Sequence, residues 1–280
     1  MTLIEHPDDL RALQQAVTLL EAPALTLQIA DVIGKPLTWS LARLPQSLQR
    51  KIQQSVRAAL HKAVDTALYT LEDNPHHAPS QGLHRAAAAA TGAVSGFFGM
   101  TGLLVELPIS TAIMMRAVAD IARSEGFSLA DEEVKSACVE VFALGGRDKT
   151  LDPTDSGYYA SRAILSDITR HASRELMAMV SKKGSTRTVS SRHAASILAK
   201  VIDAVATRFG VTLTQKMAAQ IIPVIGAASG ATINTLFTRH YQNMAKGHFT
   251  VKRLELKYGE EEIKTAYQGI KNRTLSLPDA

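Results

Sequence analysis

The chain has 280 residues, of which 46% are hydrophobic and 20% charged, so global disorder is excluded and a sizeable buried core is possible. Aromatic residues make up only 5%, which favours close-packed helices over a β-sandwich. The net charge of +5 is unevenly spread, because residues 176–254 hold 11 Lys and Arg residues against a single acid, Asp203. Such a region attracts an anionic membrane, nucleic acid or an acidic partner, unless it is simply a solvated face.

Two helices are predicted at the N-terminal end of the chain. Apolar residues recur at helical spacing after Asp8 and Asp9, and Pro23 ends the pattern; these residues are Leu10, Leu13, Val17 and Leu20. A second short helix is predicted from about Leu25 to Gly34. The first residues lack the basic start and apolar run of a signal peptide, so we expect a cytoplasmic protein.

Residues 39–62 have the pattern of a basic amphipathic helix, and no acid occurs between Asp31 and Asp65. The candidate membrane-surface residues are Trp39, Arg43, Arg50, Lys51, Arg57 and Lys62. One interpretation is a helix that lies on an anionic membrane surface. The other is an ordinary surface helix that packs its apolar stripe on the core.

Two uncharged Ala- and Gly-rich segments, residues 86–105 and 217–237, each contain a Gly-x-x-x-Gly pattern. Glycine inside a helix costs about 1 kcal/mol relative to alanine, a cost that close helix–helix approach offsets. Both segments are long enough to span a bilayer, but their glycines and the polar or helix-breaking Gln220, Pro223 and Asn234 argue against it. We therefore favour a buried helical pair, with contact to lipid or an apolar ligand as the alternative.

The remaining elements are also predicted to be helical. A helix restarts at Pro108 and ends at Gly126, and Ser128 with Asp131 forms a capping box for the next helix. Cys138 lies in that helix among apolar residues, which predicts a buried, unreactive thiol. Further helices are predicted over about 158–180 and 191–209. Residues 250–259 are predicted as a short strand or a helix start, before a charged, solvent-facing helix from Glu260.

Polar residues lie where the two uncharged segments end, and they form a candidate pocket rim. They are Glu106, Asn234, Arg239, His240 and His248. If the segments pack together, some of these side chains share one site; otherwise Glu106 and Arg239 make ordinary salt bridges and the histidines lie on the surface.

Several classes of function lack a motif in this sequence. The glycines fit neither a dinucleotide fingerprint nor a phosphate loop, and no hydrolase or metalloprotease motif occurs. His76 and His77 are adjacent rather than at ligand spacing, so neither a metal site nor a cofactor is predicted, and catalytic residues are not assigned. The basic region carries few aromatics and no known nucleic-acid motif, which disfavours nucleic acid as a partner.

Four stretches of the chain resemble the EcsC protein family, and the resemblance covers about residues 40–265. They are residues 96–108, 156–160, 222–234 and 237–255. The family takes its name from a protein encoded beside the components of a bacterial ABC transporter. The resemblance implies a bacterial, cytoplasmic, membrane-proximal protein, and it implies no active-site residue because the family carries no established catalytic mechanism.

We therefore expect an all-α fold with one multi-helix domain and a central pair of Ala- and Gly-rich segments. The expected division is N-terminal helices over 1–38, an EcsC-like domain over 39–265 and a tail over 266–280. The predicted function is non-enzymatic: a peripheral protein at the inner face of the cytoplasmic membrane, bound to an anionic surface or a membrane-protein partner, with lipid or another apolar molecule as its ligand. The alternative is an enzyme that acts on a lipid-like substrate between the two segments.

Overall fold

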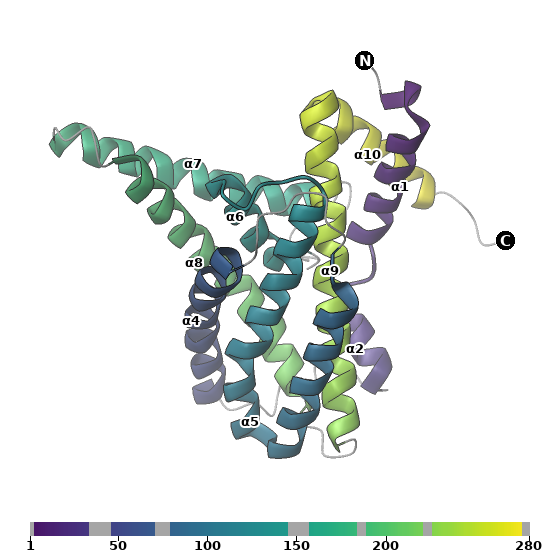
Figure 1. Cartoon of the computed structure of the whole chain (residues 1–280), viewed down its shortest axis with the longest axis vertical. Helices are drawn as coiled ribbons and strands as arrows, with labels where there is room; N and C mark the ends of the chain where they lie inside the picture. Colours follow the sequence, from purple (N-terminus) through teal and green to yellow (C-terminus); the bar gives the residue numbers. More distant parts are fainter. Residues whose placement is uncertain are drawn as a thin grey trace.

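The computed structural model describes residues 3–33, 46–70, 79–144, 157–183, 189–220 and 226–275. All regular structure in these ranges is helical, which confirms the predicted all-α single domain (Figure 1). The helices are η1 (Leu3–Glu5), α1 (Pro7–Leu20), α2 (Leu25–Ile33), α4 (Gln46–Thr70), α5 (Gln81–Ser124), α6 (Glu132–Glu140), η2 (Val141–Ala143), α7 (Gly157–Lys183), α8 (Val189–Gln220), α9 (Gly226–Tyr258) and α10 (Glu260–Leu275).

The N-terminal helices follow the predicted pattern. Helix α1 begins at Pro7, whose missing N–H costs nothing in a first turn, and Asp8 and Asp9 lie in that turn without making a side-chain cap. Its buried residues are Leu13, Ala16, Val17 and Leu20, on the face that packs against α9. Helix α2 covers the predicted second segment.

Helix α5 doubles back on itself. The backbone N–H of Ser80, just before the helix, donates a hydrogen bond of 2.6 Å to Oδ2 of Asp120, near its end. In a straight helix 40 residues would span about 60 Å. Figure 1 shows two arms of α5 joined by a turn beside its label. The first uncharged segment, residues 86–105, therefore includes the turn of a helical hairpin.

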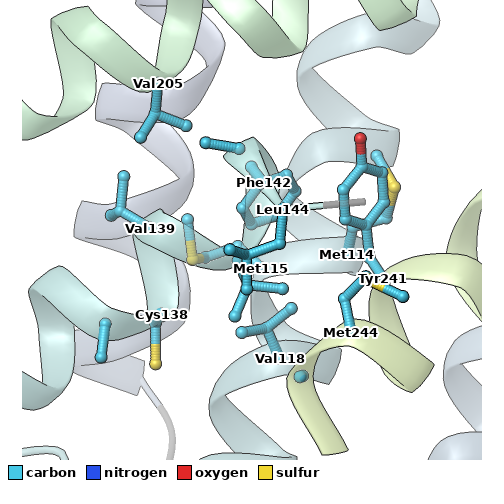
Figure 2. Close-up of a cluster of buried hydrophobic side chains, with 14 of the residues drawn as sticks. Met114, Met115, Val118, Cys138, Val139, Phe142, Leu144, Val205, Tyr241 and Met244 are labelled. Carbon is cyan, nitrogen blue, oxygen red and sulfur yellow. The ribbon is translucent and has the colours of Figure 1, made fainter. Parts of the chain in front are cut away.

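A buried cluster joins α5, α6, α8 and α9 in the middle of the molecule (Figure 2). Phe142 stacks on Tyr241, with ring centroids 4.9 Å apart, and meets Phe209 edge to face at 4.9 Å. Cys138 lies in the same cluster and is fully buried, as predicted, and burial raises the pKa of its thiol. Several Met, Val and Leu side chains complete the cluster: Met114, Met115, Val118, Val139, Leu144, Val205 and Met244.

The structure corrects four local predictions. Pro108 lies inside α5, so no helix restarts there. Residues 250–258 continue α9 and form no strand. Helix α10 is not simply solvent-facing, because its Ile263 and Tyr267 are fully buried. The capping box is absent too: Asp131 is the N-cap of α6 without a side-chain bond, and the Ser128 hydroxyl accepts from the N–H of Ala130.

Other features of the chain bear on the predicted boundaries. Gly126 has a φ of 91°, a conformation that glycine adopts without strain, and it follows α5 as predicted. The predicted boundary between residues 265 and 266 lies inside α10, and the division into three parts stays a prediction. Over the described ranges, none of the helices combines the length and apolarity that a membrane span needs.

Candidate functional site

The predicted rim residues Glu106 and Asn234 meet where α5 packs against α9. The Asn234 side-chain amide donates to the carboxylate of Glu106 and, over 3.1 Å, to the backbone oxygen of Ala88. Glu106 and Asn234 are 5% and 1% exposed. Ala88 belongs to the first arm of the hairpin and Glu106 to the second, so one amide binds both arms. The two uncharged segments therefore pack together here, and this pair forms a buried link.

The other predicted rim residues lie further along α9. Arg239 is exposed, whereas His240 is buried with its ring against Tyr241. Burial lowers the pKa of His240 to about 4, so the imidazole is neutral at physiological pH. His248 lies 14 residues beyond Asn234, about 21 Å along a helix axis. Glu106 of α5 and Asn234 of α9 thus meet, whereas Arg239, His240 and His248 lie further along α9.

His248 belongs to a second buried polar cluster, which we call the Tyr158 cluster: Tyr158, Tyr159, Arg162, His248 and Glu255. The Tyr158 hydroxyl lies 3.1 Å from Nδ1 of His248 and accepts a hydrogen bond of 3.3 Å from Arg162. In the tautomer that carries the imidazole proton on Nε2, the Tyr158 hydroxyl donates its own proton to Nδ1. Burial, followed by the positive charges of Lys252 and Arg162, holds the pKa of His248 well below its usual value.

Arg162 and Glu255 form the ion pair of the Tyr158 cluster. Two guanidinium nitrogens of Arg162 donate to the two carboxylate oxygens of Glu255, at 2.6 and 3.0 Å. The Tyr159 hydroxyl donates to the same carboxylate at 3.1 Å. Of this cluster, only His248 was predicted from the sequence. The one indication of it in the sequence is the four-residue spacing of Tyr158 and Arg162, which places both side chains on one face of α7.

A surface pocket of about 710 Å³ adjoins the Tyr158 cluster, between α6, α7, α9 and α10. It is lined by Phe127, Asp131, Glu132, Glu133, Val134, Arg162, Lys252, Glu255, Leu256 and Glu260. Acids outnumber bases in this lining, and Arg162, one of its two cations, already binds Glu255. The hydroxyl and charged groups of the Tyr158 cluster thus bind one another and join α7 to α9. Among the described residues, Nε2 of His248 has no hydrogen-bond partner.

The candidate membrane-surface residues lie on α4, except for Trp39 and Arg43, which fall outside the described residues. Arg50, Lys51, Arg57 and Lys62 are all exposed and occupy less than half of the helix circumference. The opposite face is buried through Ile52, Val56, Ala59, Leu60, Ala63, Val64 and Ala67. Helix α4 thus packs an apolar stripe on the core, as one interpretation required, and still presents its cations outward.

A groove runs between α4 and the antiparallel α8. We call it the α4–α8 groove, and it has a volume of about 780 Å³. Its lining residues are Gln46, Gln49, Arg50, Gln53 and Gln54 of α4, with Val211 and Thr214 of α8. Beyond one end, Arg57 binds Asp203 of α8 through 2.5 and 2.6 Å contacts. The groove was not predicted from the sequence, although glutamine recurs around Arg50.

The described residues contain no group of three or more His, Cys, Asp or Glu side chains arranged to hold a metal ion. Comparison with protein families matches residues 9–254 to the model described as the EcsC protein family. Comparison with curated proteins and with solved structures gives no match.

Proposed function

Since the chain belongs to the EcsC protein family, whose model matches residues 9–254, we propose that it is a peripheral membrane protein that binds an anionic membrane surface through the exposed face of α4. The observation that carries this proposal is the charge on that face. Arg50, Lys51, Arg57 and Lys62 are exposed on it, and Asp65 is the only acid in α4. The surface in question is the inner leaflet of the cytoplasmic membrane, where anionic lipids attract basic residues.

Electrostatics alone supplies an appreciable affinity. Each Lys or Arg near an anionic leaflet contributes about 1 kcal/mol. Arg57 is partly neutralised by Asp203, so Arg50, Lys51 and Lys62 provide most of the attraction. Three such cations correspond to about 3 kcal/mol, or roughly a hundredfold in binding. Charges elsewhere on α8 add to the same field: Lys200 and Arg208 lie on the helix that adjoins α4.

The alternative, an enzyme with a lipid-like substrate between the two uncharged segments, has less support. Glu106 and Asn234 bind each other there, which occupies the polar groups that a substrate would need. His248 lies further along α9, where it forms a hydrogen bond with Tyr158. The arrangement of these side chains resembles a packed interior more than a pocket mouth.

Co-sedimentation with vesicles tests the proposal. The full chain is mixed at low salt with vesicles of phosphatidylcholine alone and with vesicles that also contain phosphatidylserine. We expect binding only to the anionic vesicles, with affinity that falls as salt is added. The double variant Lys51→Gln/Lys62→Gln should bind about 30-fold less tightly, since it loses about 2 kcal/mol.

A control of equal charge change isolates the role of α4. Arg11→Gln/Lys264→Gln removes two cations from α1 and α10, which lie on the other side of the molecule from α4 in Figure 1. This variant should bind within about threefold of the wild type, because distant charges are screened. Absence of binding at low salt, or equal losses in both double variants, would contradict the proposal. A membrane-protein partner would be indicated by binding to native membranes but not to protein-free vesicles.

A further inference from the structure

We propose that the α4–α8 groove binds the glycerol-phosphate headgroup of an anionic lipid, phosphatidylglycerol. This inference rests on the proposed membrane association and specifies which lipid α4 selects. The groove lies along the basic face of α4, so a headgroup that enters it keeps its acyl chains at the membrane that the same face contacts.

The polar groups of the groove are available for a ligand. Within the described part of the chain, Arg50, Gln53 and Gln54 have no hydrogen-bond or ion-pair partner. A guanidinium binds two phosphate oxygens at once through its planar fork. Each glutamine amide both donates and accepts, and can therefore bind phosphate oxygens and the hydroxyls of a glycerol group. The combination matches a hydroxylated phosphodiester.

The floor of the groove depends on Gly210. A Cβ built at Gly210 would lie 2.2 Å from Oε1 of Gln53 and 2.6 Å from its Cδ. The Gln53 amide thus lies directly against the backbone of α8. Any larger residue at position 210 would displace the amide from this position. This contact holds Gln53 on the floor of the groove. Because Gln53 is uncharged, its contribution can be tested separately from the positive charge of α4.

The lining of the groove disfavours other lipid headgroups. A quaternary ammonium is bound by aromatic rings, and an amine by carboxylates. Among the lining residues that the structure describes, none is aromatic and none is acidic. The nearby acid Asp203 is bound by Arg57. Val211, 52% exposed, offers an apolar contact for the glycerol backbone and the start of an acyl chain. A volume of about 780 Å³ holds a headgroup of this size.

Phosphatidylglycerol and phosphatidylserine carry the same charge, so comparing them separates headgroup recognition from electrostatics. The full chain is co-sedimented with phosphatidylcholine vesicles that contain equal mole fractions of one or the other lipid. We expect the wild type to bind the phosphatidylglycerol vesicles about fivefold more tightly, as one or two additional hydrogen bonds would provide. Gln53→Met and Gly210→Ala should lose this preference and keep the binding to phosphatidylserine.

Matched controls come from elsewhere in the chain. Gly82→Ala in α5 meets no atom within 4 Å of its new Cβ, and Gln14 is exposed on α1. Gly82→Ala and Gln14→Met should therefore keep the full preference. Thermal unfolding should show that Gly210→Ala is folded, because only the end of a flexible side chain has to move.

The outcomes distinguish the headgroup proposal from membrane binding itself. Equal binding of wild type to both anionic vesicles overturns the headgroup proposal and leaves the membrane proposal standing. If neither vesicle binds, the membrane proposal fails, and the soluble headgroup glycerophosphoglycerol is titrated and followed by the NMR signals of the glutamine amides. Shifts in the wild type that are absent from Gly210→Ala support recognition of the headgroup by the groove, and the absence of any shift overturns it.

Discussion

Asn234 of α9 donates a hydrogen bond to the carboxylate of Glu106 of α5, and both side chains are buried although 128 positions separate them. The same amide reaches the backbone of Ala88, so α9 holds both arms of the α5 hairpin through one side chain. Through Ala88 and Asn234, this link joins the two uncharged segments.

Asn234→Ala is expected to destabilise the fold. Removing the amide leaves the buried Glu106 carboxylate and the Ala88 oxygen without this donor, at a cost of about 2–3 kcal/mol. The measurement is the free energy of unfolding in urea. Asn243→Ala, on the same helix but half-buried and without a hydrogen-bond partner in the described part of the chain, should cost less than about 1 kcal/mol. Equal losses for the two variants would contradict the assigned role.

Arg162→Met is expected to destabilise the protein by about 2–4 kcal/mol, because it leaves the Glu255 carboxylate unpaired at low exposure. The additional change Glu255→Gln should recover part of that loss, since a neutral amide tolerates burial better than a lone charge. Arg170→Met breaks an exposed pair with Asp167 and should cost at most about 0.5 kcal/mol. Chemical denaturation measures these differences in five proteins: the wild type, the three single variants Arg162→Met, Glu255→Gln and Arg170→Met, and the double variant. Strictly additive losses for Arg162 and Glu255 would refute their coupling.

Stability is expected to fall as the pH falls from 6.5 to 4, because His240 is buried. Its native pKa is about 4, against 6.5 for an exposed imidazole. In that window the unfolded chain binds a proton that the native state does not, so acid favours unfolding. The full difference amounts to roughly 3 kcal/mol at pH 4.

The variant His240→Gln tests this pH dependence. It should flatten the decline of unfolding free energy between pH 6.5 and 4, whereas His171→Gln, at an exposed position, should leave it unchanged. Buried His248 and His84 also have lowered pKa values, so part of the decline should persist. A wild-type protein equally stable at both pH values would show that His240 is accessible to protons in the native state.

Cys138 is expected to resist thiol reagents in the native protein, since the reactive thiolate is both buried and disfavoured. Labelling with an aromatic disulfide should proceed only in denaturant. A second thiol introduced by Ser47→Cys, at an exposed position of α4, should react at once and serves as the internal standard. Rapid modification of Cys138 under native conditions would indicate that the α6 region opens.

Periodic sequence features predicted the helices well, and contacts between distant residues account for what was missed. The apolar spacing predicted helix α1, and the glycine at 126 predicted the end of α5, because both signals act locally. Residues 250–259, for which a strand was one of two predictions, begin with two β-branched residues, Thr250 and Val251, and α9 buries both. Pro108 remains inside α5 because helix propensity yields to tertiary packing along the hairpin.

In the candidate sites, too, sequence patterns predicted some contacts, whereas other contacts between distant residues could not be predicted. The meeting of Glu106 and Asn234 could be anticipated from the paired glycine patterns. The Arg162–Glu255 pair joins residues 93 positions apart, and no local pattern relates them. The α4–α8 groove likewise requires Gly210 to lie opposite Gln53, a relationship that only the folded chain provides.

The reversal of α5 has a consequence for the order in which the protein is made. The Ser80–Asp120 hydrogen bond joins residues 40 apart, so the hairpin can close using only residues up to 124. Helix α9, which packs along both arms, begins a hundred residues later, at Gly226. Contacts between near residues form before contacts between distant ones. During synthesis on the ribosome, the apolar surface of the hairpin that α9 covers in the folded protein is thus expected to stay exposed until α9 has been made.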